Sequence, residues 1–357
     1  MTKKIRVLIV DDSAMVRKVL SSILTSDPQI EVVATARDPY EARDILVHEK
    51  PDVITLDIEM PKMDGVSFLK KFMRILPTPT IIISSLAEKG KDITIKALEA
   101  GAVDIITKPK VSVTDKLETI SDDIINRVKS ASKSKVSALQ PKAETQITAN
   151  SAKKACKDFT HLEETTDKVI GIGASTGGVE HLARIMPQFP PTTPGIAIVQ
   201  HMPEGFTNSF AKRLNEISQI RVKEAEDNDK LHPGIALLAP GGNHHMEVVR
   251  IGGEYRVKLV EGEKVSFNRP AVDVLFDSIA KNVGKNSACA LMTGMGRDGA
   301  KGLLNCKNAG GTTIIQDEKS CIVFGMPGEA KNLNAAEKEV SLEKIPETLL
   351  QSMVKKI

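Results

Sequence analysis

The sequence has few aromatic residues, no tryptophan and no long apolar run. Only 3% of its 357 residues are aromatic, so the stacking surfaces of proteins that bind single-stranded nucleic acid are not expected. The formal net charge of +3 is also too small to indicate nucleic acid as a partner. No stretch approaches the roughly 18 apolar residues of a membrane span, and the apolar run after Lys4 is too short for a signal peptide. We therefore expect a cytoplasmic protein without membrane insertion.

Cysteine is scarce as well, and its spacing disfavours two kinds of site. Cys156, Cys289, Cys306 and Cys321 contain no C-x-x-C pair, which argues against a zinc ribbon or a dithiol redox site. A disulfide framework would need more numerous and closer pairs. We expect four reduced thiols.

Length and composition predict two domains joined by a flexible linker. At about 150 residues per domain, 357 residues suit two domains. Residues 127–166 are rich in Ser, Lys, Ala and Thr, carry 8 basic against 4 acidic residues and show no sustained apolar period. This composition is typical of a solvated linker. We predict domains at 1–126 and 167–357 and a linker at 127–166.

Short β-branched runs alternate with amphipathic stretches in both domains. In the first domain the candidate strands are 5–10, 31–36, 53–56, 80–83 and 103–106, and in the second they are 168–174, 195–200, 235–239, 288–293 and 312–316. Strands that alternate with helices indicate an α/β fold with a doubly wound parallel sheet. Residues 246–260 alternate around Gly252-Gly253 and predict an antiparallel hairpin within the second domain.

Five polar residues follow strands of the first predicted sheet. Asp11 and Asp12 end the first strand, Asp57 the third and Ser84 the fourth, and Lys108 follows the fifth. The carboxyl ends of parallel strands share one edge of a sheet, and three carboxylates there repel one another unless a cation such as Mg²⁺ binds. Asp57 could then attack a phosphoryl donor while Ser84 and Lys108 hold the phosphoryl oxygens. Taken alone, Asp12 could instead be a helix N-cap.

A glycine-rich turn in the second domain admits three interpretations. Gly171, Gly173 and Gly177 resemble a dinucleotide fingerprint, but the next strand ends in Gln200-His201 and lacks the acidic residue that would hold a ribose. The same segment fits a nucleophile elbow around Ser175. A turn that only packs a strand against a helix is the third interpretation.

The elbow gains support from two further strand ends. His201 follows the neighbouring strand, and Asp298 follows the strand predicted at 288–293. A hydroxyl, an imidazole and a carboxylate at one edge of a sheet are the members of a catalytic triad. Their order, Ser175, His201, Asp298, differs from the order in α/β-hydrolases, so that fold is not implied.

Other polar residues are weaker candidates. His181 lies six helical positions after Ser175, which turns it away from the serine. We predict that His244 and His245 lie in a plain loop and that Asp227 and Asp229 are solvated.

The motifs of the first domain resemble those of response-regulator receiver domains, which have a flavodoxin-like fold. They are Val10-Asp11-Asp12-Ser13, LDIEMPKMDG at 56–65, Ser84-Ser85 and Lys108-Pro109. The resemblance implies that Asp57 is the phospho-acceptor and that Asp11 and Asp12 join it in binding Mg²⁺. It also implies that Ser84 is the switch hydroxyl and that Lys108 contacts the phosphoryl group.

The second domain resembles the chemotaxis-receptor protein-glutamate methylesterase family, with a Rossmann-like sheet. The shared motifs are GASTGG at 173–178, QHMP at 200–203, RPAVDVLF at 269–276, LMTGMGRDG at 291–299 and CIVFGMP at 321–327. The resemblance implies a phosphorylation-regulated serine esterase that demethylates chemoreceptor glutamates, releases methanol, deamidates receptor glutamines and serves chemotaxis adaptation. A histidine kinase would be the phosphodonor, and the esterase would need no cofactor.

These assignments suggest a mechanism and leave two alternatives open. Ser175 would attack the ester, His201 would take its proton, Asp298 would orient the imidazole, and backbone N–H groups near Thr176 and Met295 would hold the oxyanion. The receiver would cover the esterase cleft until Asp57 is phosphorylated. The alternatives are a non-enzymatic regulator that binds DNA or protein and a nicotinamide-dependent oxidoreductase.

Overall fold

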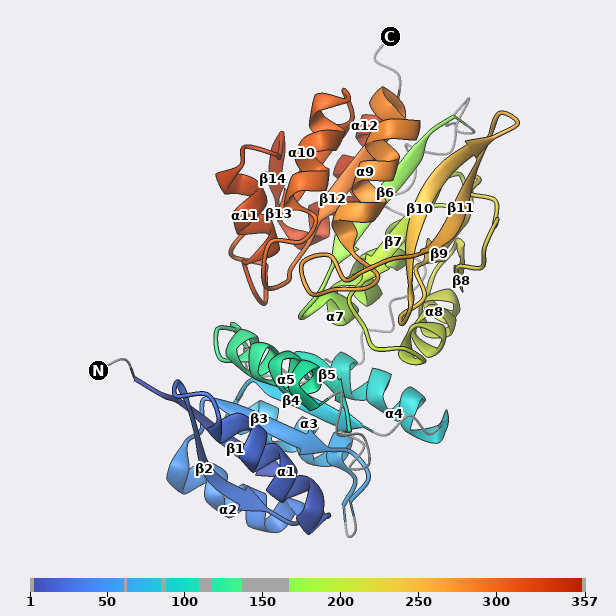
Figure 1. Ribbon diagram of the computed structural model, residues 1–357. Helices are drawn as coiled ribbons and strands as arrows, with labels where there is room; N and C mark the ends of the chain where they lie inside the picture. Colours follow the sequence, from blue (N-terminus) through green and yellow to red (C-terminus); the bar gives the residue numbers. More distant parts are fainter. Residues whose placement is uncertain (1–2, 61–62, 85–87, 109–116, 137–166, 355–357) are drawn as a thin grey trace. The chain divides into compact units, whose positions relative to one another are not determined.

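The chain divides into two compact units, Met1–Ala143 and Glu144–Ile357. The computed structural model describes residues 3–60, 63–84, 88–108, 117–136 and 167–354. Each unit has its own parallel sheet (Figure 1). Within the described ranges, no helix has the length and apolar character needed to cross a membrane.

The first unit is a five-stranded parallel sheet with helices on both faces (Figure 1). Its elements are β1 (Ile5–Val10), α1 (Ala14–Thr25), β2 (Ile30–Ala36), α2 (Pro39–Glu49), β3 (Val53–Asp57), α3 (Gly65–Ile75), β4 (Thr80–Ser84), α4 (Glu88–Glu99), β5 (Asp104–Thr107) and α5 (Leu117–Ala131). The strand order is β2-β1-β3-β4-β5. Every residue of β3 and β4 is buried, because helices cover both faces of the sheet, and this is why these strands appear in the sequence as continuous apolar runs.

Helix α5 runs past the predicted start of the linker. Residues 127–131 are helical, and Ile124, Val128 and Ala131 are fully buried. These three residues lie at positions i, i+4 and i+7 and form the buried stripe of the helix. The predicted linker start at residue 127 therefore falls inside α5. The polar composition that indicated a linker includes Ser130, which is buried in this helix, and Lys129, which pairs with Asp27 at 2.6 Å. Residues 137–166 of the predicted linker lie outside the described residues.

The second unit contains a seven-stranded parallel sheet. Its strands are β6 (Val169–Ala174), β7 (Gly195–Gln200), β8 (Arg221–Glu224), β9 (Ile235–Leu238), β12 (Ser287–Leu291), β13 (Thr312–Gln316) and β14 (Lys338–Val340). Its helices are α7 (Gly178–Ile185), α8 (Phe206–Ile217), α9 (Val272–Asn282), α10 (Ala300–Asn308), α11 (Met326–Asn332) and α12 (Ile345–Met353). Short 3₁₀ turns lie at Met186–Gln188, Gly284–Asn286 and Leu342–Lys344. The order is β14-β13-β12-β6-β7-β9-β8. Strand β6 therefore lies between β7, which follows it in sequence, and β12, which is reached much later.

The predicted α/β fold class is confirmed in both units, while two strands escaped prediction. Strands β8 and β14 are short edge strands with few buried residues, so they lack the apolar run that identifies the inner strands. Among the described residues, Cys289, Cys306 and Cys321 form no disulfide, and Cys156 lies outside the described ranges.

The predicted antiparallel hairpin is present as a separate two-stranded sheet. It consists of β10 (His244–Ile251) and β11 (Glu254–Glu261). Gly252 and Gly253 form the turn with φ of 57° and 88°, values that suit a tight hairpin turn. Strand β10 packs against α9, so the hairpin covers the helix that reaches the site described below.

Candidate functional site

Ser175 and His201 follow neighbouring strands at the carboxyl edge of the second sheet. Ser175 comes directly after β6 and His201 directly after β7. The backbone N–H of His201 donates to the Ala174 carbonyl over 3.0 Å, and the N–H of Ser175 donates to the Thr293 carbonyl over 2.9 Å. Thr293 lies just beyond β12, so the Ser175 turn is tied to the strands on both sides of β6. This is the point at which strand order reverses, where doubly wound sheets bind ligands.

His201 and Asp298 are joined by a buried hydrogen bond. The distance from His201 Nε2 to Asp298 Oδ2 is 2.7 Å. The Asp298 carboxylate also accepts hydrogen bonds from the backbone N–H groups of Val272, over 2.8 Å, and Asp273, over 3.0 Å. These residues begin α9, and a helix N-terminus favours an anion. The carboxylate thereby orients the imidazole and leaves Nδ1 as the ring nitrogen available to another group.

Ser175 is partly exposed beside this pair. Ser175 and His201 are both among the described residues, and no hydrogen bond joins the Ser175 hydroxyl to the His201 ring in this structure. A Cβ atom added to Gly294 would lie 2.7 Å from Ser175 Cβ, so only glycine lets the loop after β12 approach the serine so closely. The next backbone N–H, that of Met295, makes no hydrogen bond to any described residue.

The glycines of β6 create room for α9. A Cβ atom on Gly173 would lie 2.3 Å from Val272 Cγ1, and one on Gly171 would lie 2.7 Å from Ile279 Cδ1. These glycines bring the helix close to the strand, which places its N-terminus beside Asp298. Their role in helix packing removes the main support for the dinucleotide interpretation. Gly177 adopts φ of 79° at the start of α7 and faces Ile322.

His181 is buried and lies beside Gln316. Its Nδ1 atom lies 3.2 Å from Gln316 Nε2, and burial lowers the pKa of His181 to about 4. The residue is therefore neutral near pH 7 and structural, in agreement with the sequence argument against it.

The prediction of a plain loop at His244 and His245 is wrong, because both residues begin β10. His245 is buried. Its Nδ1 atom accepts a hydrogen bond from the Ala271 N–H over 3.1 Å, and its Nε2 atom donates to the Glu263 carbonyl over 2.8 Å. Ala271 directly precedes α9, so this histidine anchors the segment that holds Asp298. A pair of adjacent histidines carries no local signal of such a contact.

Three further aspartates, Asp227, Asp229 and Asp273, differ in how well the sequence predicted their surroundings. Asp227 is exposed, as predicted, and accepts a hydrogen bond from the Leu259 N–H. Asp229, also predicted to be solvated, is only partly exposed, pairs with Lys223 at 3.0 Å and accepts a hydrogen bond from the Glu226 N–H. Asp273 was not singled out by the sequence. It is buried and accepts a hydrogen bond from the Gly302 N–H over 2.8 Å, and burial, with the nearby charge of Asp298, raises its pKa to about 6.

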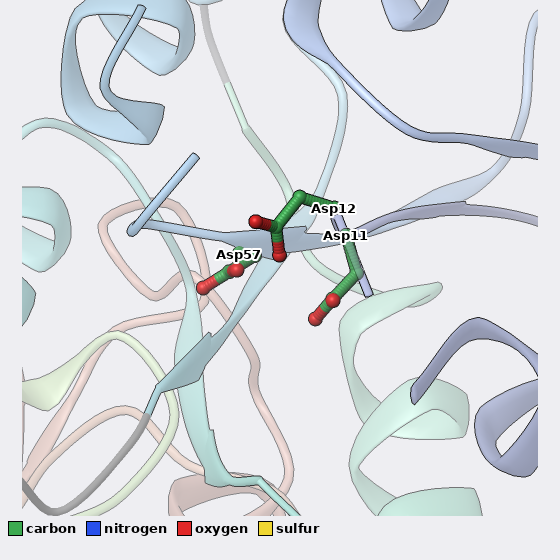
Figure 2. A group of neighbouring side chains, drawn as sticks. All are labelled: Asp11, Asp12 and Asp57. Carbon is green, nitrogen blue, oxygen red and sulfur yellow. The ribbon is translucent and has the colours of Figure 1, made fainter. Parts of the chain in front are cut away.

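The first unit brings together the three predicted carboxylates. Asp11 and Asp12 follow β1 and Asp57 ends β3 (Figure 2). One oxygen from each lies within 4.8 Å of the others. Lys108 Nζ lies 2.7 Å from Asp57 Oδ2 and 3.2 Å from Asp11 Oδ2.

The electrostatics of this cluster favour a further cation. Burial raises the pKa of Asp57 to about 6, although Lys108 opposes the shift, and burial also raises the pKa of Asp11. One ammonium group therefore does not compensate for the buried carboxylates. Three carboxylate oxygens on an edge where Asp12 is exposed form a donor set that fits Mg²⁺.

Ser84 and Lys108 lie on the adjacent strand ends. The Ser84 hydroxyl accepts a hydrogen bond from the Thr94 hydroxyl of α4 over 2.9 Å, and the Lys108 N–H donates to the Ser84 carbonyl over 2.8 Å. The N-cap of α1 is Ser13, whose hydroxyl accepts from the Val16 N–H. The alternative role of Asp12 as the N-cap is therefore wrong, and its carboxylate remains available to a metal.

Comparison with known proteins matches both units. The family model described as CheB methylesterase matches residues 170–349, and that of the response regulator receiver domain matches residues 7–118. A protein-glutamate methylesterase/protein-glutamine glutaminase of Sulfurimonas denitrificans is 52% identical over 93% of this chain and 94% of its own length. A protein of the same description from Bdellovibrio bacteriovorus is 48% identical over 99% and 98%. The crystal structure of the Thermotoga maritima CheB methylesterase catalytic domain is 40% identical, with a TM-score of 0.50, over 52% of this chain and 97% of that chain.

Proposed function

Because the chain belongs to the CheB methylesterase family and carries a receiver domain, we propose that it is a phosphorylation-regulated serine esterase. Its substrates would be glutamate methyl esters on chemoreceptors, and it would also deamidate specific receptor glutamines. It would act in chemotaxis adaptation in the cytoplasm, without binding nucleic acid or inserting into a membrane. Residues 167–357 would form the catalytic domain. The observation that carries the proposal is the His201–Asp298 hydrogen bond of 2.7 Å beside the Ser175 turn.

Ser175 would be the nucleophile and His201 its base. Since Nε2 of His201 is engaged by Asp298, the proton of the Ser175 hydroxyl would pass to Nδ1 as the oxygen attacks the ester carbonyl. Asp298 would hold the imidazole in one tautomer and stabilise its protonated form. The serine and imidazole would come within hydrogen-bond distance when substrate binds, since such contacts often tighten only in the complex.

Two backbone N–H groups would stabilise the tetrahedral intermediate. The N–H of Met295 makes no hydrogen bond within the described residues, and the N–H of Thr176 belongs to the peptide that follows Ser175. Both would donate to the oxyanion. Methanol would leave after receiving the proton from His201, and His201 would then activate water to release glutamate and regenerate Ser175. The same steps release ammonia from a glutamine side chain. This chemistry uses only protein groups, so we expect no cofactor for the esterase.

The receiver would regulate the esterase through Asp57. Its carboxylate would accept a phosphoryl group from a chemotaxis histidine kinase, while Lys108 would contact the phosphoryl oxygens and Ser84 would respond as the switch hydroxyl. Asp11, Asp12 and Asp57 would hold Mg²⁺, which supplies charge neutralisation when bound. The unphosphorylated receiver would inhibit the catalytic domain.

The esterase proposal is tested by methanol release from methylated receptor. Substitution Ser175→Ala should lower the rate by at least about a thousandfold, because the nucleophile is removed, while leaving the melting temperature nearly unchanged. Wild-type activity that survives this substitution would contradict the assignment of Ser175. Wild-type protein that releases no methanol, with or without a phosphodonor, would contradict the proposed function.

A further inference from the structure

We infer that Gln200 is a positioning residue that fixes the backbone of both the nucleophile and the base. This inference rests on the proposed function of Ser175 and His201. Gln200 is the last residue of β7 and is 2% exposed, so it cannot touch a substrate. It would act through its neighbours.

The carboxamide of Gln200 bridges the two residues. Its Nε2 atom donates to the Ser175 carbonyl over 2.9 Å and to the His201 carbonyl over 3.1 Å. Both acceptors are oxygens, which assigns the nitrogen to this side of the amide. One side chain thereby joins the peptide after the nucleophile to the peptide after the base.

The surroundings of the Gln200 amide oxygen indicate that this residue is retained for its hydrogen bonds to the Ser175 and His201 carbonyls rather than for packing. Oε1 is buried and has no hydrogen-bond partner among the described residues. Burying an unpartnered amide oxygen is unfavourable, so an apolar side chain would serve the core better. The structure also leaves space for this oxygen, since a Cβ atom on Gly178 would lie 2.1 Å from it. Such a local cost is typical of groups retained for function rather than stability.

The contact with Ser175 determines where the Thr176 N–H points. The Ser175 carbonyl accepts a second hydrogen bond, from the Gly178 N–H over 2.8 Å. The carbonyl of Ser175 and the N–H of Thr176 belong to one planar peptide. Two donors that hold the carbonyl therefore also set the direction of the N–H that is proposed to bind the oxyanion. Loss of the Gln200 contact should weaken binding of the transition state more than binding of the substrate.

The test is the substitution Gln200→Met in the full-length protein. Methionine has a similar length and donates no hydrogen bond at this position. We expect kcat for methanol release to fall at least about tenfold with KM changed less than about twofold. Labelling of Ser175 by a fluorophosphonate probe should slow by a similar factor. Rates are normalised to the folded fraction. If Gln200→Met does not fold, Gln200→Asn keeps a neutral amide but is one methylene shorter, so it cannot reach both carbonyls and should show the same loss.

Asn282→Leu is the matched control. The Asn282 amide also donates to two backbone carbonyls, those of Val248 at 2.8 Å and Ser278 at 3.1 Å, but it ends α9, at the opposite end from Asp298. Asn282→Leu should have a lower melting temperature than the wild type and an unchanged kcat. If Gln200→Met loses stability in the same way and keeps its kcat, Gln200 is structural and the inference is wrong. Failure of the proposed function is distinguishable, because wild-type protein would then release no methanol.

Discussion

Two carboxylates, Asp57 and Asp298, show how single residues are prepared for different chemistry. The Asp298 carboxylate accepts hydrogen bonds from two backbone N–H groups and contacts the His201 imidazole. Asp57 has Lys108 as a partner but lies near Asp11, and burial raises its pKa to about 6. The strand-end positions of these residues were predictable, because each directly follows an apolar run or a glycine-rich motif. The two backbone hydrogen bonds to Asp298 were not predictable, because their donors lie 25 and 26 residues away.

At this scale we predict that Asp57→Asn stabilises the receiver in the absence of divalent cations. The pKa of Asp57 is higher in the folded chain, about 6, than its ordinary value of 3.8, so the folded state binds the proton more tightly. The free energy of unfolding contributed by this residue therefore falls as pH rises from about 4 to about 6 and stays low above that range. The free energy of unfolding of the variant should exceed that of the wild type by on the order of 1–3 kcal/mol near pH 7.

Chemical denaturation of both proteins near pH 4.5 and near pH 7.5 measures this difference. The difference in free energy of unfolding between the two proteins should be smaller at the lower pH, and Mg²⁺ should stabilise the wild type more than the variant. Asp273 contributes a pH dependence of the same sign, but it is present in both proteins and cancels in the comparison. A gap that does not change with pH would contradict the assignment to Asp57.

The N-terminus of α9 is the element on which the esterase site depends. It donates two hydrogen bonds to Asp298, and its first residue packs against Gly173 of β6. The N–H of Ala271, just before the helix, donates a hydrogen bond to His245. The sequence indicated the helix and the strands by their apolar periodicity. It could not indicate the His245 contact, which joins the start of β10 to a segment 26 residues later.

We predict that His245→Leu and His244→Leu have very different effects. The first substitution removes a buried ring that has two backbone hydrogen-bond partners, and it leaves the Ala271 N–H unpaired. It should lower the free energy of unfolding by about 1–3 kcal/mol and reduce methanol release. The second alters a side chain that is 42% exposed and should change stability by less than about 0.5 kcal/mol. Denaturant titration and the esterase assay check both. Equal effects of the two substitutions would remove the anchoring role of His245.

At the scale of the whole molecule, each unit has its own sheet and its own core. The similar Thermotoga maritima structure contains the catalytic domain of that protein alone. Two domains were predictable from length and repeated strand–helix patterns. The end of the first domain was not predictable, because the last turn of α5 mixes polar residues with Val128 and Ala131 and buries one of them, Ser130.

We predict that phosphorylation of Asp57 raises esterase activity by roughly tenfold, within the usual range of coupling between sites. A small-molecule phosphodonor with Mg²⁺ should activate the wild type and leave Asp57→Asn unchanged. A fragment starting near residue 167 should exceed the activity of the unphosphorylated full chain. Methanol release per mole of folded protein measures all three. A fragment no more active than the unphosphorylated chain would contradict inhibition by the receiver.

The sequence by itself determined the two α/β units and the polar residues at their strand ends. This is possible because buried parallel strands require continuous apolar runs and because parallel strands bring their carboxyl ends to one edge. Only the tertiary structure decided that β7 and β12 flank β6, that Nε2 of His201 faces Asp298, and that Gln200 and His245 support the site. These contacts join segments far apart in the chain or depend on side-chain direction, and neither is encoded in local periodicity.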